Sequence, residues 1–436
     1  MEMNKVRHKR NSDNLNLSSE VFLDDSMSLN ERAKLFSSAL KSYKDIGKAN
    51  YHRLILSPAD REVLVQDEYN NEVRKMIMFG SNNYLGLANH PYIKEKVIES
   101  VRVNGSGIGG SPFLNGYTKL AKTLEERLAH IKNQESAVLF SSGYSANLGL
   151  VYGLMKNSDY LVYDDYSHAS FYDGIRLARP RSKRFSHNSV SELEKMVNEL
   201  KDIQYRDLFV AVEGLYSMDG DTAPLPEISA ICKNNGALLV LDDAHGTGVL
   251  GDNGHGTGEY YGMASDIDIA IGTFSKAMSV NGGFIAASKD IIEFLRWYSR
   301  SYMFSAAMPP PTLAAAHAAL DIIEQEPHRR EQLRNNIDYL SVQLNGLKWE
   351  FNIQAESPII IVKVPSEMDI QKANMIFHEN NVFVNAIEYP AVDHDNQRFR
   401  ISLMATHTKD DLDRLVELID KIWSLWSAGN RDVCFD

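Results

Sequence analysis

The sequence predicts an α/β protein with a mainly parallel sheet, followed by a smaller α+β domain. Between about residues 90 and 305, short apolar runs alternate with helical stretches, which is typical of parallel sheets covered on both sides. Most of these runs are apolar throughout, as expected of strands buried on both faces. Three prolines at 309–311 then break the chain, and runs of helices and strands follow them.

The elements of the larger region follow from this pattern. Amphipathic helices are expected at 93–103 and 119–131, and a third at 189–202. The third helix begins with Ser189 and Glu192, a capping box that satisfies two backbone amides at a helix start. Strands are expected at 137–140, 160–163, 208–213, 237–242, 267–272 and 283–287.

The region after the prolines predicts fewer and more varied elements. Helices are expected at about 312–325 and 328–346, and short strands at 359–364, 382–386 and 398–403. A last helix should follow Thr408, because apolar residues from Leu412 to Trp426 fall on one stripe.

Composition excludes several classes of protein. The 46 basic and 58 acidic residues give a net charge of −12, which argues against nucleic-acid binding. The only two cysteines, Cys232 and Cys434, favour a reducing compartment and give no metal-cluster spacing. There is neither a long apolar run nor a secretory signal, so we expect a cytoplasmic protein without a membrane span. Residues 1 to about 30 are polar and are interpreted as a flexible arm, or as one ordered by a partner subunit.

The stretch Gly105–Gly110 contains the pattern GxGxxG, which is a weak signal. A dinucleotide site needs a strand before this pattern and a helix opening on it. Here a helix is expected before it, and Pro112 interrupts the segment after it. We therefore interpret it as an exposed loop, or as a loop lying near a ligand, in preference to a nicotinamide site.

Two residues that follow apolar strands carry the strongest chemical signal. Asp242 ends an apolar strand, and Lys276 follows another apolar strand 34 positions later. Taken singly, Asp242 and His245 fit a solvated turn or an incomplete metal pair, and Lys276 fits an exposed loop. Together they suit pyridoxal 5′-phosphate, because a carboxylate holds the pyridine proton and a lysine binds the aldehyde as a Schiff base.

Two further segments could serve the same cofactor. Residues 142–144 follow a strand and open a helix, a geometry that binds phosphate on backbone amides, although an ordinary capped helix looks the same. His168 also lies just past a strand, where it is either structural or stacked on a cofactor ring.

The motifs at 82–87, 141–144, 167–170, 213–221, 242–245 and 273–276 together resemble those of the α-oxoamine synthases, which are fold-type-I pyridoxal phosphate enzymes. The resemblance spans about residues 75–425. Residues 113–116, 273–276 and 304–306 look most like bacterial serine palmitoyltransferase. Residues 242–248 are more similar to 8-amino-7-oxononanoate synthase and glycine C-acetyltransferase.

The resemblance implies a C-acyltransferase that joins a small L-amino acid to an acyl thioester with loss of CO₂. Serine is favoured, with alanine or glycine as the alternative. Lys276 would hold the cofactor and then remove the Cα proton, while Asp242 would hold the pyridine proton. The resemblance also implies that His168 stacks on the cofactor ring and that Ser217 and His245 bind its phenolic oxygen. Thr273 and residues Ser142, Gly143 and Tyr144 would bind the phosphate. Arg400 would bind the substrate carboxylate, and Asn82 would lie near the acyl thioester.

The resemblance also implies a homodimer with its active site at the interface, so that the glycine loop can serve the partner subunit. It divides the chain into an N-terminal arm and contact segment (1–75), a large cofactor-binding domain (76–305) and a C-terminal small domain (306–436). Pro112 and Ala121 stand where the family usually has arginine and histidine near the thioester entry. The acyl donor, coenzyme A or a carrier protein, is therefore left open.

Two other classes compete with this interpretation. A fold-type-I aminotransferase would use Asp242 and Lys276 in the same way but would release a keto acid and no CO₂. A non-catalytic partner subunit of a synthase need not keep its Schiff-base lysine, so the presence of Lys276 argues against it.

Overall fold

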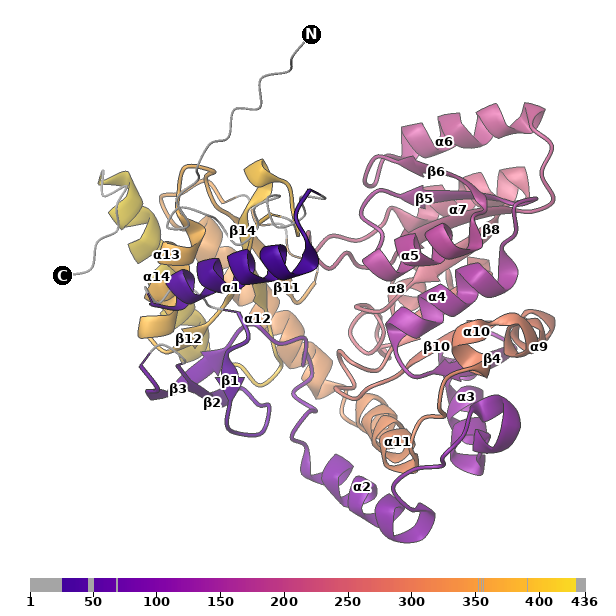
Figure 1. Cartoon of the computed structure of the whole chain (residues 1–436), viewed down its shortest axis with the longest axis horizontal. Helices are drawn as coiled ribbons and strands as arrows, with labels where there is room; N and C mark the ends of the chain where they lie inside the picture. Colours follow the sequence, from indigo (N-terminus) through magenta and orange to yellow (C-terminus); the bar gives the residue numbers. More distant parts are fainter. Residues whose placement is uncertain are drawn as a thin grey trace.

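A seven-stranded sheet forms the centre of the larger half of the molecule (Figure 1). The computed structural model describes residues 26–45, 51–67, 70–351, 353, 355, 357–389 and 391–428. The strand order is β4-β10-β9-β8-β7-β5-β6, and β10 alone runs antiparallel to its neighbours. The strands are β4 (Ser136–Phe140), β5 (Tyr160–Asp164), β6 (Arg181–Phe185), β7 (Leu208–Glu213), β8 (Leu238–Asp242), β9 (Ile269–Thr273) and β10 (Gly283–Ala287).

Helices cover both faces of this sheet because its inner strands are apolar on both sides. Along β7, Phe209 and Ala211 join one buried cluster, whereas Val210 and Val212 join another. The first cluster includes residues of α4 (Gly143–Leu154), α5 (Ala169–Ala178), α9 (Lys289–Tyr298) and α10 (Arg300–Met303). The second includes α6 (Val190–Glu199) and α7 (Leu225–Asn235), while α3 (Lys119–Ile131) and the short α8 (Thr257–Tyr260) lie elsewhere in this half.

Two smaller sheets form the other half, which lies to the left in Figure 1. The first has the order β1-β2-β3-β12, so that an N-terminal hairpin pairs with a strand more than 300 residues later, Ile77 opposite Val382. The second has the order β11-β14-β13. The strands are β1 (Leu54–Ile55), β2 (Glu62–Gln66), β3 (Val73–Met78), β11 (Ile359–Lys363), β12 (Val382–Phe383), β13 (Asn385–Ile387) and β14 (Arg398–Ser402).

Helices surround these sheets and connect the two halves. In Figure 1, α2 and α11 lie side by side below the large sheet, and their residues contact one another. The last helix begins at a complete capping box, in which Thr408 and Asp411 each bond the other's backbone amide. The helices are α1 (Leu29–Asp45), α2 (Pro91–Asn104), α11 (Pro310–Gln325), α12 (His328–Asn345), α13 (Ile370–Glu379) and α14 (Lys409–Ser427).

The fold confirms the α/β prediction and most predicted elements, with shifts of one or two residues at their ends. It corrects the helix start at Ser189: Glu192 accepts from the amide of Ser186 (2.8 Å), so only half of the predicted capping box forms. Residues 382–386 split into β12 and part of β13. Residues 1–25 of the predicted arm lie outside the described residues, and the last residues of the arm belong to the start of α1. Cys434 also lies outside the described residues.

The sequence analysis assigned no range to β1–β3 and β6, nor to the helices α1, α5, α7–α10 and α13. β6 reads Arg-Ser-Lys-Arg-Phe because it is an edge strand with only Phe185 buried, so it lacks an apolar run. No helix among the described residues is long and apolar enough to cross a membrane. The division into domains at residues 75 and 305 stays a prediction.

Candidate functional site

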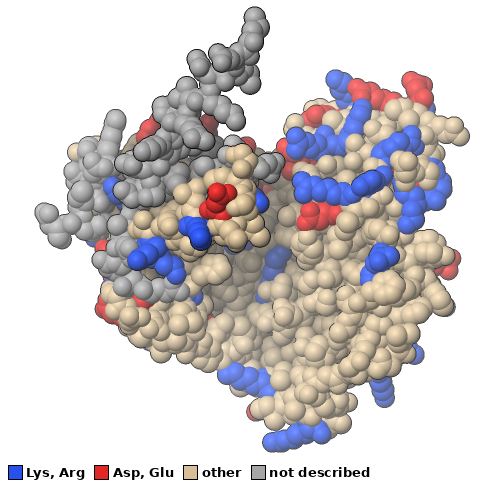
Figure 2. Space-filling view, viewed as in Figure 1, with Lys and Arg blue, Asp and Glu red and all other residues tan. Residues whose placement is uncertain are grey.

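A cavity of about 260 Å³ opens where β7, β8 and β9 end. Figure 2 shows that the molecule is hollowed between its two halves. Side chains at the carboxyl ends of parallel strands commonly line ligand sites. Eight of the predicted site residues line this cavity: Ser142, Gly143, Tyr144, His168, Asp242, His245, Thr273 and Lys276. It is also lined by Asn147, Glu213, Ala244, Ile271, Gly272, Ser275, Asn281 and Gly282.

Two carboxyl groups meet at the floor of the cavity. Glu213 and Asp242 are the last residues of the adjacent parallel strands β7 and β8 and lie opposite each other in register. Both are nearly inaccessible, at 6% and 9% exposed. Burial, and then the neighbouring Asp242, raises the pKa of Glu213 well above its usual value. Glu213 therefore favours its neutral form, while Asp242 can accept a hydrogen bond from a positively charged pyridine nitrogen.

Lys276 follows β9 in a tight turn facing these carboxyl groups. The hydroxyl of Thr273 anchors that turn by donating to the carbonyl of Gly282 (2.9 Å). Burial lowers the pKa of Lys276 to about 8, although Asp242 and Glu213 act in the opposite direction. An amine with this pKa is partly unprotonated near neutral pH, as a nucleophile toward an aldehyde must be.

A hydrogen-bonded chain links His168 to Asp242 through residues that the sequence analysis did not assign. His168 caps α5, and its Nδ1 lies 2.7 Å from the hydroxyl of Ser170. The Nδ2 group of Asn147 donates both to that hydroxyl (3.0 Å) and to Asp242 Oδ2 (2.7 Å). Asn147 lies one turn after Gly143 in α4, so the helical period after the motif at 141–144 was the signal that could have found it.

The start of α4 fits a phosphate group. Ser142 caps the helix by accepting from the amide of Ser145 (3.0 Å), which leaves the amides of Gly143 and Tyr144 beside the cavity. A Cβ atom on Gly143 would lie 3.0 Å from Thr273, so glycine lets the helix start approach the hydroxyl groups after β9. Backbone amides at a helix start favour anions.

Ser217, Asn82 and Arg400 do not line the cavity, but the structure brings them together. Arg400 is buried in β14 and donates through Nε to the carbonyl of Ser217 (2.6 Å) and through Nη2 to Asn82 Oδ1 (3.1 Å). Nη1 donates to the hydroxyl of Ser402 (3.0 Å). A guanidinium has five donors, so these three bonds leave part of it for a substrate carboxylate.

His245 and this arginine are joined by Tyr84, another residue that the sequence analysis did not assign. The Tyr84 hydroxyl lies 2.7 Å from Nδ1 of His245 and 3.2 Å from Asn82 Oδ1. Burial, together with the charges of Lys276 and Arg400, lowers the pKa of His245 well below its usual value.

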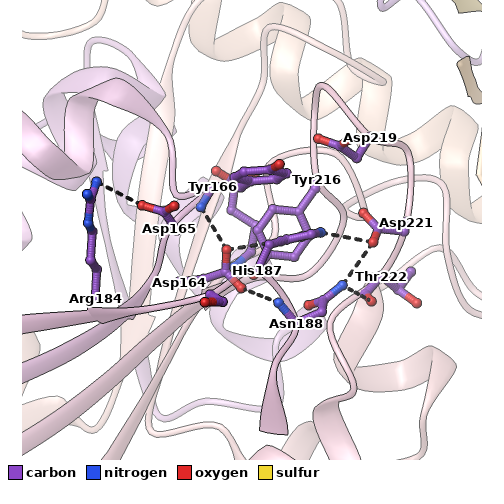
Figure 3. Close-up of polar contacts among 12 residues, drawn as sticks. Asp164, Asp165, Tyr166, Arg184, His187, Asn188, Tyr216, Asp219, Asp221 and Thr222 are labelled. Atoms are coloured by element: carbon purple, nitrogen blue, oxygen red, sulfur yellow. Dashed lines mark hydrogen bonds and ion pairs between the residues drawn. The ribbon is translucent and has the colours of Figure 1, made fainter. Parts of the chain in front are cut away.

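A second polar cluster lies beside the loop that carries Ser217, and Figure 3 shows how it closes on His187. The imidazole lies between two carboxylates, 3.0 Å from Asp164 through Nδ1 and 3.0 Å from Asp221 through Nε2. Tyr166 stacks on its face at a centroid distance of 4.3 Å. Burial opposes the charged form, but the two carboxylates outweigh it and raise the pKa of His187 to about 10. This cluster fixes the loop by charge pairing.

Pro112 and Ala121, which depart from the family pattern, line a separate narrow crevice. Glu125 lies in its wall and accepts from the hydroxyl of Tyr117 (2.9 Å) and from Arg296 (2.6 Å). The glycine-rich stretch Gly105–Gly110 is an exposed loop that follows helix α2. A dinucleotide site would need a strand before this stretch.

The residues present fit pyridoxal phosphate. The aldehyde, the pyridine nitrogen and the phosphate each find a complementary group around one cavity, in Lys276, Asp242 and the start of α4. Among the described residues, Asn147 Oδ1 is buried without a hydrogen-bond partner. None of the described residues forms a His, Cys, Asp or Glu group that could hold a metal ion.

Comparisons with known proteins agree with this fit. Residues 74–419 match the family model for aminotransferase class I and II. The chain is 35% identical to 8-amino-7-oxononanoate synthase from Lysinibacillus sphaericus over 387 residues, covering 89% of this chain and 97% of that protein. It is 36% identical to serine palmitoyltransferase from Sphingobacterium spiritivorum over 396 residues, covering 91% and 96%. The fold is similar to a serine palmitoyltransferase variant from S. paucimobilis solved with bound PLP–myriocin aldimine, with a TM-score of 0.83, 28% identity, and 92% and 100% of the two chains covered.

Proposed function

The chain belongs to the aminotransferase class I and II family and, within it, to the α-oxoamine synthases, and from that premise we propose that L-serine is its amino-acid substrate. As a member, it is a pyridoxal phosphate-dependent acyltransferase. The family reaction is the decarboxylative condensation of an amino acid with an acyl thioester. A bond forms between the α-carbon and the acyl carbon, the thiol leaves, and the carboxylate departs as CO₂.

The observation that carries the proposal is the shared cavity of Lys276, Asp242 and His168. When bound, the cofactor supplies a ring that accepts electron density from the substrate's α-carbon. Lys276 would bind the aldehyde and would take the α-proton of the substrate at Nζ as the general base. Asp242 keeps the ring nitrogen protonated, and His168 covers the ring.

The remaining predicted residues hold the reactants in place. The amides of Gly143 and Tyr144, with the hydroxyl of Thr273, bind the phosphate. His245 and Ser217 bind the phenolic oxygen. Arg400 binds the substrate carboxylate through the part of its guanidinium that its protein partners leave, and Asn82 lies beside it, toward the acyl thioester.

A small amino acid is favoured because the resemblance to the α-oxoamine synthases implies one. The small residues Ala244, Gly272, Ser275 and Gly282 line the cavity around Lys276 and leave room there for a bound molecule. Serine is placed first because of the likeness to serine palmitoyltransferases in sequence and fold. Alanine is the second candidate, because an 8-amino-7-oxononanoate synthase is almost equally similar in sequence.

Titrating the visible absorbance of the loaded enzyme with serine, alanine, glycine and threonine tests this choice. We expect serine to change the spectrum at the lowest concentration. A pocket that bonds the hydroxyl rejects alanine by about 10⁴-fold, whereas a merely small pocket discriminates by about 10- to 200-fold. If a large amino acid acts at lower concentration than all the small ones, the serine proposal is wrong.

Arg400 and Arg398 offer a matched pair for the carboxylate site, because both are buried on β14 two residues apart. Arg398 instead donates through Nη1 to Asp219 Oδ1 (2.7 Å) and to the carbonyl of Met218 (2.7 Å). Hydrogen bonds to charged groups contribute about 1.5–3 kcal/mol, so Arg400→Lys should raise KM for serine about tenfold or more. A larger rise in Arg398→Lys would contradict the assignment.

The acyl donor is either an acyl-coenzyme A or an acyl-carrier protein. Following thiol and CO₂ release with matched acyl chains on the two carriers separates them, with Lys276→Ala as the inactive control. Release of a keto acid without CO₂ would instead indicate an aminotransferase.

We also propose a homodimer in which the glycine loop contacts the partner subunit. Large apolar side chains are exposed on and near the turn after that loop, namely Leu114 (81%), Phe304 (71%) and Trp297 (61%). Trp297 packs against Phe113 at a centroid distance of 4.8 Å, and the face over α4 and α10 carries few charged side chains in Figure 2.

Light scattering tests the dimer. It should give a mass of twice 49.1 kDa, and Trp297→Glu should reduce it toward the monomer. Val342→Glu is the control, because Val342 is similarly exposed (67%) on α12. A monomeric wild-type protein would contradict the proposal.

A further inference from the structure

Tyr84 and His245 form a buried pair between the cavity and the arginine of β14. Tyr84 is fully buried, His245 is 2% exposed, and the hydroxyl oxygen lies 2.7 Å from Nδ1. No other hydrogen bond joins His245 to the described residues through its side chain, so Nε2 is the nitrogen left for a molecule bound in the cavity.

Both groups of the pair are uncharged at neutral pH. Burial raises the pKa of the Tyr84 hydroxyl to about 12. The same cause, reinforced by Lys276 and Arg400, lowers the pKa of His245. The short contact between them therefore contains one proton, and the question is which atom carries it.

Asn82 decides where the Tyr84 proton points. If His245 donated from Nδ1, the hydroxyl would have to donate to Asn82 Oδ1 instead, at 3.2 Å. That distance exceeds the usual range for a bond between a hydroxyl group and oxygen. The same oxygen already accepts from the charged Nη2 of Arg400 (3.1 Å) and lies 3.5 Å from the hydroxyl of Ser402. The 2.7 Å contact makes Nδ1 the better acceptor for Tyr84.

The turn that carries Tyr84 is held tightly enough to maintain this geometry. The carbonyl of Tyr84 accepts from the amide of Ala405 (2.7 Å). Next to it, Asn83 Oδ1 accepts from the amide of Leu87 (2.7 Å) and from the hydroxyl of Ser279 (2.6 Å), three residues after Lys276. The tyrosine turn and the lysine turn are therefore bonded directly to each other.

We propose that Tyr84 is a positioning residue that donates to Nδ1 of His245 and so fixes this histidine with its proton on Nε2. The hydrogen bond made by one ring nitrogen sets the protonation of the other. His245 thus presents a donor to the cavity, which suits an anionic oxygen of the bound cofactor. That choice of oxygen rests on the proposed function, whereas the tautomer does not.

The arrangement also gives Arg400 an indirect influence on His245. Because Arg400 occupies Asn82 Oδ1, it keeps the Tyr84 proton directed toward the imidazole. Removing the guanidinium in Arg400→Leu should release that oxygen and move part of the His245 population to the Nδ1-protonated form.

Nitrogen NMR of the full-length chain with ¹⁵N-labelled histidine tests the proposal directly. His245→Gln identifies the resonances, and spectra are recorded with and without pyridoxal phosphate. We expect wild-type His245 to carry its proton on Nε2 in both states. A proton on Nδ1 overturns the proposal, and this result needs no variant of Tyr84 to fold.

Tyr84→Phe provides the second readout. Its His245 should become a mixture of tautomers, and kcat should fall about fivefold, the change for one hydrogen bond, with KM for serine nearly unchanged. Tyr92→Phe is the control, because it removes a hydroxyl bonded to Asp321 (3.0 Å) far from the cavity. An unchanged tautomer in Tyr84→Phe contradicts the proposal. If the tautomer is as expected but no condensation occurs, the proposed function fails and the inference stands.

Discussion

His187 and His245 each follow a strand of the large sheet, β6 and β8 respectively, and are held in opposite charge states. His187 lies between the carboxylates of Asp164 and Asp221, which raise its pKa to about 10. His245 lies between a neutral tyrosine and two cations, and burial lowers its pKa. The first histidine has both nitrogens paired by protein groups, whereas the second keeps one nitrogen for the cavity.

The groups around the two histidines also differ in whether their charges are paired within the protein. Around His187, the buried carboxylate of Asp164 also accepts from the amides of Tyr166 and Asn188, so its charge is satisfied within the protein (Figure 3). Around the cavity, Lys276 and Glu213 have pKa values displaced toward their neutral forms. Clusters that complete their own pairing stabilise the fold, and clusters left incomplete at a cavity can act on a bound molecule.

The largest effect should come from the cavity side, in Lys276→Ala. Losing both the covalent attachment and the general base should lower the condensation rate by at least about 10³-fold, with the far-ultraviolet spectrum unchanged. Lys289→Ala, an exposed lysine at the start of α9, is the matched control. Turnover within a factor of ten of wild type would remove Lys276 from the mechanism.

Asp242→Asn should have the next largest effect, because an amide no longer holds a proton on the ring nitrogen. We expect weak retention of the cofactor and a turnover lower by about 10²-fold, or about 2.7 kcal/mol of barrier. The measurement is steady-state kinetics at saturating cofactor. Asp268→Asn is a suitable control, because this half-buried carboxylate only caps the amide of Leu239 (2.7 Å). Near-normal turnover in Asp242→Asn would show that the ring nitrogen has another partner.

His187→Gln should act on stability and leave the chemistry largely intact. Removing one partner of a buried ion pair costs about 3–5 kcal/mol of unfolding free energy, because Asp164 stays buried. We expect a lower denaturation midpoint with kcat changed less than in the cavity variants. A variant that is fully stable but inactive would place His187 in the mechanism and contradict its purely structural role.

The same cluster predicts a pH dependence. The pKa of His187 is raised on folding, so its stabilisation is complete below about pH 6.5, the unfolded pKa, and is lost as the pH rises toward about 10. Denaturant titrations between these values should show wild-type stability falling with pH more steeply than that of His187→Gln. Parallel curves for the two proteins would contradict a charged His187.

The smallest effect concerns two helix caps that are alike in geometry. Ser142 caps α4 at the cavity and Ser189 caps α6 near the surface, each accepting from an amide three residues later. Either serine replaced by alanine should lose about 1 kcal/mol of stability. Only Ser142→Ala should also weaken cofactor binding, as measured by equilibrium dialysis. Equal cofactor affinity in the two variants would argue against a phosphate at α4.

The sequence predicted the strands that are apolar and the residues that stand at their ends. β7 and β10 were predicted to the residue, because strands buried on both faces give a continuous apolar run. β6 was missed because an edge strand needs no such run. β1 to β3 were missed because they are short or only half buried and give no continuous apolar run, and the pairing of β3 with β12, about 300 residues later, leaves no local pattern.

The site shows the same limit. Asp242 and Lys276 stand out because a carboxylate or an amine directly after a buried strand is unusual. Tyr84 and Asn147 do not stand out, since their roles depend on contacts with residues 161 and 95 positions away. Likewise, Glu192 could be recognised as part of a helix cap, but the amide it bonds, that of Ser186, is set by the loop before the helix.

The most direct test of the account is chemical trapping of the cofactor on the wild-type chain. The loaded enzyme is reduced with borohydride, digested, and its peptides are mapped by mass spectrometry. The account predicts that pyridoxyl phosphate is attached to Lys276 and that prior addition of serine prevents the attachment. Attachment to any other lysine, or none at all in a chain that binds the cofactor, would contradict it.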